Sequence, residues 1–369
     1  MRSAVARTLK TGKRSLLGWA KRAGAFGRVA DSEWRRRRLL ILCYHGVALE
    51  DEHLWNGPLY MSPSDLRARF ELLRAGGYNV LPLDEALQRL YVRDLPPRSV
   101  TLTFDDGYHD FYAAAWPLLQ EFGYPATVYL TTLRCGKDVP IFNLAVPYML
   151  WKQRGRAYDG GAAGLGSLDL RTAPTRAEAW EQIQRAARGL NLVGKHELAQ
   201  AVSDAIGADY AGICARRLLT IMTPEQVSKL SARGLDVQLH THRHWTPQVR
   251  EKFEDEIVCN RERIVDLTGR NPVHFCYPSG LYKREFLPWL SDLDVVSATT
   301  CDPGFATERS EALLLPRLID HDGLSALEFE GWLSGASAFT ARKAAAYRRS
   351  AAPSRVTSGV LPGRAAGRR

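Results

Sequence analysis

The chain has 369 residues, of which 45% are hydrophobic and 24% charged, a composition typical of a folded globular protein and unlike that of a fibrous or wholly disordered chain. The formal net charge is +10, but residues 1–38 hold 12 Lys and Arg against two acids, and residues 342–369 hold eight with no acid. Because the region between these segments is net negative, the sequence does not predict specific nucleic-acid binding, which requires positive charge on a folded face.

The chain is predicted to begin with a basic tail or surface helix at residues 1–38. Its stretch "SLLGWAKRAGAF" mixes apolar and basic residues, and its apolar run is too short for a membrane span or an export signal. Residues 334–369, rich in Pro, Gly, Ser and Ala, are predicted to be a disordered basic tail. Both tails allow contact with an anionic membrane surface. We therefore expect a cytoplasmic location, or a peripheral one at the inner membrane face, with the six cysteines reduced.

Short apolar runs alternate with segments of helical spacing between the tails. The apolar runs predict strands at 39–44, 99–104, 126–131, 235–240, 273–277 and 295–300. The helical spacing predicts helices at 64–75, 110–122, 223–233 and 250–268. Nearly continuous apolar strands separated by helices are typical of a parallel sheet covered on its faces, so the fold class is α/β, as a layered sheet or a barrel.

Residues 154–220 interrupt this alternation. They open with the Gly-rich stretch "DGGAAGLGSLD" and continue with a helical run at 175–190, which predicts a long helical insertion between two core strands. Long insertions near strand ends often shape substrate sites. We expect this insertion, together with "FNLAVPYMLW" at 142–151, to carry substrate specificity.

Two adjacent acids, Asp105 and Asp106, end the predicted strand in "LTFDDGYHD". In parallel α/β folds, side chains that act on ligands gather at the carboxyl ends of strands. Either acid alone would serve as a cap for the following helix. A cap needs only one carboxylate, so the second one indicates a chemical role.

A histidine cluster, "HTHRH", ends another predicted strand. On an extended segment His240 and His244 lie on the same face, so both can point at one centre. Two imidazoles and one carboxylate form a site that leaves positions open for water and substrate, and such a site suits Zn²⁺ as well as Co²⁺, Ni²⁺ or Fe²⁺. One acid of the pair could then bind the metal while its neighbour acts as a base.

The motifs "TFDDGY", "HTHRH" and "FCYPSG" together resemble those of the polysaccharide deacetylases, carbohydrate esterase family 4, over residues 39–333. The resemblance implies a distorted (β/α) barrel of about seven strands. It also implies a metal-dependent hydrolase that removes N-acetyl groups from an N-acetylated glycan. Carried onto this chain, it makes Asp105 the catalytic base, and Asp106, His240 and His244 the ligands of a divalent metal, with Zn²⁺ preferred and Co²⁺ or Ni²⁺ as alternatives.

The resemblance also implies a general acid and groups that stabilise the oxyanion. His45, at the end of the first strand in "ILCYHGV", and His321, in "LPRLIDHD", compete for the role of acid, and His45 is preferred. Tyr277 and Pro278 of "FCYPSG" are expected to lie beside the substrate, with a backbone N–H near Tyr277 facing the oxyanion. The arginine usual in this third motif is missing, and Arg317 is the predicted substitute that orients Asp105.

An alternative from another class is a catalytically impaired module that retains the fold to bind a metal or a glycan. Metal binding alone does not need Asp105, so its presence favours the enzyme. The sequence does not distinguish among the N-acetylated glycans, and it carries no prediction of oligomeric state.

Overall fold

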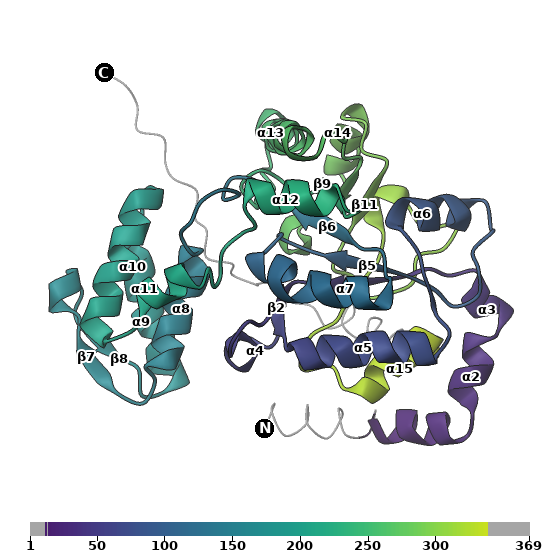
Figure 1. Ribbon diagram of the computed structural model, residues 1–369, viewed down its shortest axis with the longest axis horizontal. Helices are drawn as coiled ribbons and strands as arrows, with labels where there is room; N and C mark the ends of the chain where they lie inside the picture. The colour runs from purple at the N-terminus through teal and green to yellow at the C-terminus, as the bar shows by residue number, and fades with distance from the viewer. Residues whose placement is uncertain (1–11, 13, 339–369) are drawn as a thin grey trace.

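A computed structural model describes residues 12 and 14–338 of the chain (Figure 1). Its centre is one parallel sheet with strand order β11, β10, β9, β6, β5, β1 and β12. In chain order these strands are β1 (Leu40–Tyr44), β5 (Ser99–Phe104), β6 (Thr127–Leu130), β9 (Asp236–Leu239), β10 (His274–Cys276), β11 (Ser297–Thr299) and β12 (Leu318–Ile319). A further strand, β4 (Asn79–Val80), pairs with the beginning of β5. Six of these eight strands were predicted; the two-residue strands β4 and β12 were not.

The segment around β12 closes the sheet into a distorted barrel. β12 pairs in parallel with β1 through Leu318 and Ile319. Three residues before β12, Leu315 forms a parallel bridge with Thr299 of β11 and donates its N–H to the carbonyl of Ala298 at 2.8 Å. The last segment of the barrel therefore contacts both the first strand and the last strand before it, and the predicted distorted barrel of about seven strands is confirmed.

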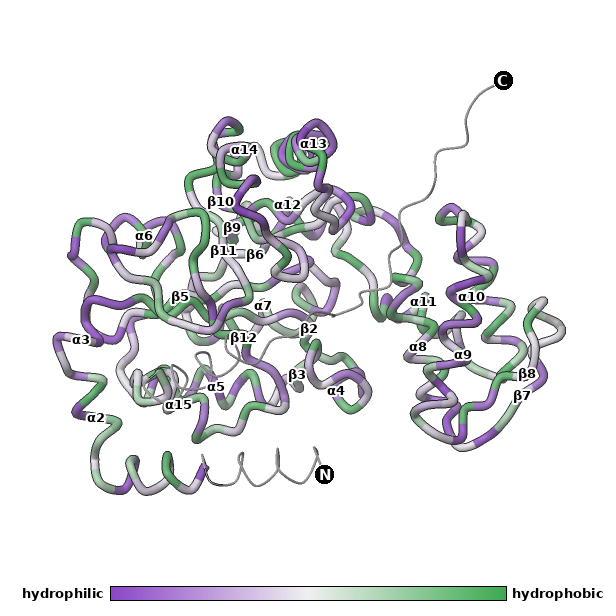
Figure 2. The backbone as a smooth tube through the Cα atoms, turned by 180° about the vertical axis from the view of Figure 1, so that it is seen from behind, coloured by the Kyte–Doolittle hydropathy of each residue, from purple (hydrophilic) through white to green (hydrophobic). Residues whose placement is uncertain are grey.

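Helices cover the outside of the barrel, with hydrophobic and hydrophilic stretches alternating along them (Figure 2). They are α5 (Pro63–Ala75), α6 (Leu83–Tyr91), α7 (Trp116–Phe122), α12 (Pro224–Ser231), α13 (Arg250–Thr268), α14 (Phe286–Asp292) and α15 (Ala326–Ser334). A π-helical turn, η1 (Phe111–Ala115), precedes α7 and continues into it. Smaller elements on the barrel are β2 (Gly46–Val47), α4 (Glu52–Trp55), β3 (Tyr60–Met61), η3 (Pro278–Gly280) and η4 (Ala312–Leu314). The helices predicted at 64–75, 223–233 and 250–268 agree with α5, α12 and α13 to within two residues.

Alternation along the strands divides the side chains between the helices and the barrel interior. Leu40, Leu42 and Tyr44 of β1 belong to the large cluster that packs under the covering helices. Leu39 and Ile41 belong to a separate cluster that also contains Tyr129 and Cys276 from distant strands. Residues of β1 with odd numbers therefore face the barrel interior. Cys43 and His45 continue this odd-numbered series after Ile41. Their side chains therefore lie toward the carboxyl ends of the strands.

The predicted insertion, residues 154–220, is part of a lobe that begins earlier, at residue 142, and is seen on the left in Figure 1. It contains α8 (Phe142–Lys152), β7 (Ala157–Asp159), η2 (Gly161–Ala163), β8 (Ser167–Asp169), α9 (Ala173–Ala186), α10 (Leu192–Ile206) and α11 (Tyr210–Ala215). These elements share a hydrophobic cluster to which α8 contributes, so the "FNLAVPYMLW" segment belongs to the same lobe; Tyr60 of β3 joins the cluster from the barrel. The chain leaves the lobe beside the barrel rim, where Tyr108 and Ile221 form an antiparallel bridge.

The N-terminal region contributes a helical stretch at residues 14–22 and the short helices α2 (Ala25–Ala30) and α3 (Glu33–Arg36). α2 packs against α15, and the side chain of Arg35 is fully buried. Its Nε donates to the carbonyl of Leu333 and its Nη2 to the carbonyl of Ser99, both at 3.0 Å. This part of the predicted tail region 1–38 therefore packs against the barrel. Residues 1–11, and residues 339–369 of the predicted C-terminal tail, lie outside the described residues. In the described part of the chain, no helix is long and apolar enough to cross a membrane.

Candidate active site and metal centre

The carboxyl ends of β1, β5, β9 and β10 and the segment preceding β12 bring the predicted site residues together. Asp105 and Asp106 directly follow β5, and both side chains are almost completely buried. Asp106 has a positive φ of 69° and Gly107 one of 80°. A Cβ on Gly107 would lie 2.3 Å from the side chain of Leu130, so only glycine fits this turn. The turn points the two neighbouring carboxylates in different directions.

Asp105 points into the barrel and is held by Arg317. Nη1 and Nη2 of Arg317 donate to Oδ1 and Oδ2 of Asp105, both at 2.7 Å. The guanidinium is fully buried and also donates to the carbonyl of Thr300 and the hydroxyl of Thr103. Burial raises the pKa of Asp105, but the charge and hydrogen bonds of Arg317, together with the nearby His45 and His240, outweigh burial and hold the pKa below its usual range. Asp105 is therefore ionised at neutral pH.

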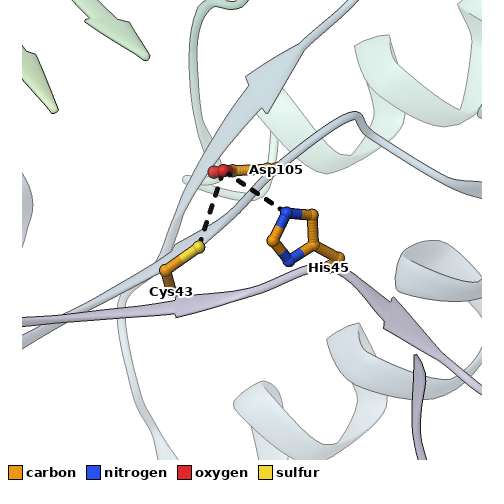
Figure 3. Close-up of side chains that lie close together, drawn as sticks. All are labelled: Cys43, His45 and Asp105. Atoms are coloured by element: carbon orange, nitrogen blue, oxygen red, sulfur yellow. Dashed lines mark hydrogen bonds and ion pairs between the residues drawn. The ribbon is translucent and has the colours of Figure 1, made fainter. Parts of the chain in front are cut away.

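Two thiols and one imidazole also approach the carboxylate of Asp105. The Sγ atoms of Cys43 and Cys276 lie 3.5 and 3.4 Å from Asp105 Oδ2. Nε2 of His45 lies 3.8 Å from the same oxygen, and its side chain is partly exposed. Figure 3 shows Cys43 and His45 on one stretch of chain, both directed at Asp105. Burial raises the pKa of both thiols well above the ordinary value, so each is a neutral S–H group that can donate to the carboxylate.

Asp106 faces two histidines from the segment after β9. Its Oδ1 lies 3.3 Å from Nε2 of His240 and 3.1 Å from Nε2 of His244. Burial raises the pKa of Asp106, and the two imidazoles more than offset this and bring the pKa well below its ordinary value. The donor atoms of the three residues all lie within 4.8 Å of one another, close enough to share one cation.

The surroundings of His240 orient its ring for metal binding. Nδ1 of His240 lies 2.9 Å from the carbonyl oxygen of Cys276, and because a carbonyl only accepts, this nitrogen carries the proton. In the neutral form of this ring Nε2 then holds the lone pair, and this nitrogen faces Asp106. The backbone N–H of His240 donates to Oδ1 of the buried Asn260 at 2.9 Å. Such hydrogen bonds fix the tautomer and orientation of metal-binding histidines, so these residues fit a divalent cation.

The remaining predicted residues lie around this centre with different contacts. His242, between the two histidines, contacts the hydroxyl of Thr132 through its Nδ1 at 3.0 Å. His321 follows β12, next to β1 in the sheet, and its Nδ1 accepts the N–H of Gly323. Tyr277 follows β10, and its N–H donates to the carbonyl of Thr299 at 3.2 Å, so this donor is engaged within the sheet. Pro278, which has no N–H, begins the short helix η3.

A sequence model of the family described as polysaccharide deacetylase matches residues 92–298, more than half of the chain. The chain belongs to the polysaccharide deacetylase family. Its poly-beta-1,6-N-acetyl-D-glucosamine N-deacetylase relative from Escherichia coli (strain K12) is 33% identical over 99 residues. That match covers 27% of this chain and 14% of the relative, so the two share only a small part of the relative's length.

Solved structures share the fold of this polysaccharide deacetylase family member. The Streptococcus pyogenes deacetylase PplD, in complex with acetate, superposes with a TM-score of 0.52 and 19% identity, covering 79% of this chain and 96% of that one. IcaB from Ammonifex degensii gives a TM-score of 0.51 and 18% identity, covering 81% and 97%. At these identities the similarity establishes the barrel fold, while roles of individual residues must be argued from their own geometry.

Three residues of the site were not identified from the sequence of this family member. Cys43 and Cys276 contact the carboxylate of Asp105, and Asn260 of α13 supports His240. Cys43 could have been found, because it lies two residues before His45 on a strand and therefore shares its face. Asn260 lies in the middle of a long helix, and nothing in its neighbours indicates that its amide reaches a strand end.

Proposed function

We propose that this chain is a metal-dependent hydrolase that removes N-acetyl groups from an N-acetylated sugar polymer. The observation that carries the proposal is that two neighbouring acids have different surroundings. Asp105 is paired with Arg317 and approached by His45, whereas Asp106 faces the Nε2 atoms of two histidines. The first arrangement suits a proton acceptor beside a proton donor, and the second suits a cation site.

In this proposal Asp106, His240 and His244 hold the metal, and Zn²⁺ is preferred because two imidazoles and one carboxylate suit it, with Co²⁺ or Ni²⁺ able to replace it. When bound, the cation supplies Lewis acidity that activates water and stabilises negative charge on the acyl oxygen. The family's action on N-acetylated polysaccharides supports the choice of substrate class.

The chain's own residues then move the protons. Asp105 accepts a proton from the attacking water, and its ionised state at neutral pH is maintained by Arg317. The leaving amine must be protonated before it departs, and His45, partly exposed and 3.8 Å from Asp105, is the proposed donor. Residues of "FCYPSG" lie at the same rim. Since the N–H of Tyr277 is bonded to Thr299 and Pro278 has none, we propose that one other backbone N–H near Tyr277 faces the oxyanion.

The test separates the metal ligands from the base. Acetate release from N-acetylglucosamine oligomers and bound metal are measured together for the parent, Asp106→Asn and Asp105→Asn. We expect a chelator to abolish turnover and added Zn²⁺ to restore it. Asp106→Asn should lose both metal and turnover, whereas Asp105→Asn should keep the metal and lose turnover. His242→Ala, which changes the histidine between the two ligands, is the matched control and should retain both.

Two results would contradict this function. Acetate release that persists after metal removal would exclude a metal-dependent reaction. A parent protein that binds metal through Asp106 but releases no acetate from any N-acetylated glycan offered would instead support the metal-binding or glycan-binding module considered from the sequence.

A further inference from the structure

A second group of potential metal ligands includes Asp105 but neither histidine of the proposed metal centre. It consists of Cys43, His45 and Asp105, whose donor atoms all lie within 4.8 Å of one another (Figure 3). The proposed function uses Asp105 and His45 for proton transfer and leaves the Cys43 thiol without a chemical role. The three residues are a thiol, an imidazole and a carboxylate, the ligand types that zinc and related cations prefer.

The spacing of these atoms is close to that of a tetrahedral site. Zinc bonds of about 2.3 Å to sulfur and 2.1 Å to oxygen at tetrahedral angles place the sulfur about 3.6 Å from the oxygen. The corresponding nitrogen and oxygen atoms would lie about 3.4 Å apart. In this structure Cys43 Sγ lies 3.5 Å from Asp105 Oδ2, and His45 Nε2 lies 3.8 Å from it. Small side-chain rotations of His45 would complete the geometry.

The ion pair with Arg317 does not use all of the oxygen's acceptor capacity. Each carboxylate oxygen can accept two contacts, and Arg317 takes one on each oxygen. The other contacts on Oδ2 come from the weak S–H donors of Cys43 and Cys276, which a cation would displace. Metal-binding carboxylates are commonly hydrogen-bonded by a second partner of this kind. His45 is partly exposed, so a cation can approach from the mouth of the site.

The thiol on the opposite side of Asp105 is not equivalent. Sγ of Cys276 lies 3.0 Å from Nη2 of Arg317, so a cation bound there would meet the guanidinium charge directly. The imidazole nearest to that thiol belongs to His240, whose Nδ1 donates to the Cys276 carbonyl and whose Nε2 faces Asp106. The cluster around Cys43 is therefore the better cation site of the two.

We propose that Cys43, His45 and Asp105 form a second, inhibitory site for a thiophilic divalent cation such as Cd²⁺ or excess Zn²⁺. Binding converts the Cys43 thiol to a thiolate, and its proton passes to solvent. The cation occupies lone pairs of Asp105 and His45, so neither can take part in proton transfer. The inhibitory effect rests on the proposed function, whereas binding of the cation does not.

A thiolate signal distinguishes this site from the histidine centre, which contains no sulfur. The metal-free full chain is titrated with Cd²⁺, and the ultraviolet thiolate-to-cadmium charge-transfer band is followed together with the amount of cation bound. We expect the parent to bind a second equivalent that produces the band. Cys43→Ser should lose that equivalent and the band, while Cys276→Ser and Cys259→Ser should keep both. His45→Ala, which removes a partly exposed ligand, should weaken binding of this equivalent at least about tenfold.

Turnover provides the second measurement, with each variant compared with its own rate at limiting Zn²⁺. Excess Zn²⁺ should inhibit the parent and Cys276→Ser, and at least about tenfold more Zn²⁺ should be needed to inhibit Cys43→Ser. Mg²⁺, a hard cation that avoids thiolates, should not inhibit. A thiolate band or zinc inhibition that survives unchanged in Cys43→Ser would overturn the proposal. If the chain released no acetate at all, the proposed function would be wrong. The thiolate-to-cadmium band would still show whether the Cys43, His45 and Asp105 site binds a cation.

Discussion

Two buried carboxylates at different strand ends of the barrel each pair with an arginine, and the pairs differ in geometry. Asp105 after β5 receives two hydrogen bonds of 2.7 Å from Arg317. Asp320 after β12 receives bonds of 2.9 and 3.3 Å from Arg69, whose guanidinium also donates to the carbonyl of Leu324. The second pair is longer and less symmetric, while both guanidinium groups also donate to other acceptors.

The pKa values of the two acids move in opposite directions. Burial raises both pKa values, but at Asp105 the Arg317 charge and hydrogen bonds, with the nearby His45 and His240, outweigh burial and bring the pKa below its usual range. At Asp320 burial prevails over the Arg69 charge and raises the pKa to about 6. An arginine neighbour therefore does not by itself make a buried carboxylate a permanent anion. The shorter, symmetric contact distinguishes the proposed catalytic base from an acid that can take up a proton.

The largest expected effect comes from removing the symmetric contact. Arg317→Met leaves the Asp105 charge buried without a partner, which typically costs about 3–5 kcal/mol of unfolding free energy. Turnover should also fall by at least about 10², because the base loses its orientation and its charge. Urea denaturation and acetate release measure the two effects. Adding Asp105→Asn to Arg317→Met should recover part of the stability but no turnover; a double variant less stable than Arg317→Met would contradict the pairing.

The next effect concerns the imidazole on the Asp105 side. His45→Ala should lower turnover by about 10²–10⁴ with bound metal unchanged, because the leaving amine loses its proton donor. His321→Ala changes the histidine that follows Asp320, and it should leave turnover within a few-fold of the parent. Near-normal turnover in His45→Ala, together with a large loss of turnover in His321→Ala, would show that His321 and not His45 is the proton donor.

A smaller effect follows from the raised pKa of Asp320. Because the folded chain binds this proton more tightly than the unfolded chain, the stabilisation is fully present below about pH 4 and is lost as the pH rises through about 6. Relative to Asp320→Asn, the parent should therefore lose about 2–3 kcal/mol of unfolding free energy between pH 4 and 7. Urea denaturation of both proteins across this range measures the difference, and parallel pH profiles would disprove the shift.

The smallest effect is expected from Arg69→Met. Asp320 can take up a proton when its partner is removed, so the buried charge disappears instead of remaining unpaired, and the cost should be about 1–2 kcal/mol. Arg309→Met, at an exposed arginine, is the matched control and should stay within about 0.5 kcal/mol of the parent. Urea denaturation checks both variants. If Arg69→Met were as unstable as Arg317→Met, the contrast between the two pairs would not hold.

The sequence was sufficient to predict most of the barrel because its strands are continuous apolar runs. The strand that closes the barrel was missed because only two residues, Leu318 and Ile319, form it, between the polar residues Arg317 and Asp320. No periodic pattern fits in so short a segment. The N-terminal charge run was also difficult to interpret, since a count of basic residues does not reveal that Arg35 is fully buried and bonded to backbone carbonyls.

The site was predictable where its residues are adjacent in the chain and less so where the fold brings them together. Asp105 and Asp106 are neighbours, and His240 and His244 are four residues apart, so local spacing indicated both groups. Arg317 is 212 residues from Asp105, and only closure of the barrel creates their contact. Its selection relied on the absence of the family's usual arginine, a signal that comes from the resemblance and not from local chemistry.

Closure of the barrel by its last segment has a consequence for protein synthesis. Arg317 belongs to the segment that contacts both β11 and β1, whereas the acid it stabilises is made more than two hundred residues earlier. While the chain grows from its N-terminus, Asp105 has no guanidinium partner until residues 315–319 have left the ribosome. A partly synthesised chain therefore cannot hold the proposed base buried and charged, and the site matures only when the barrel is complete.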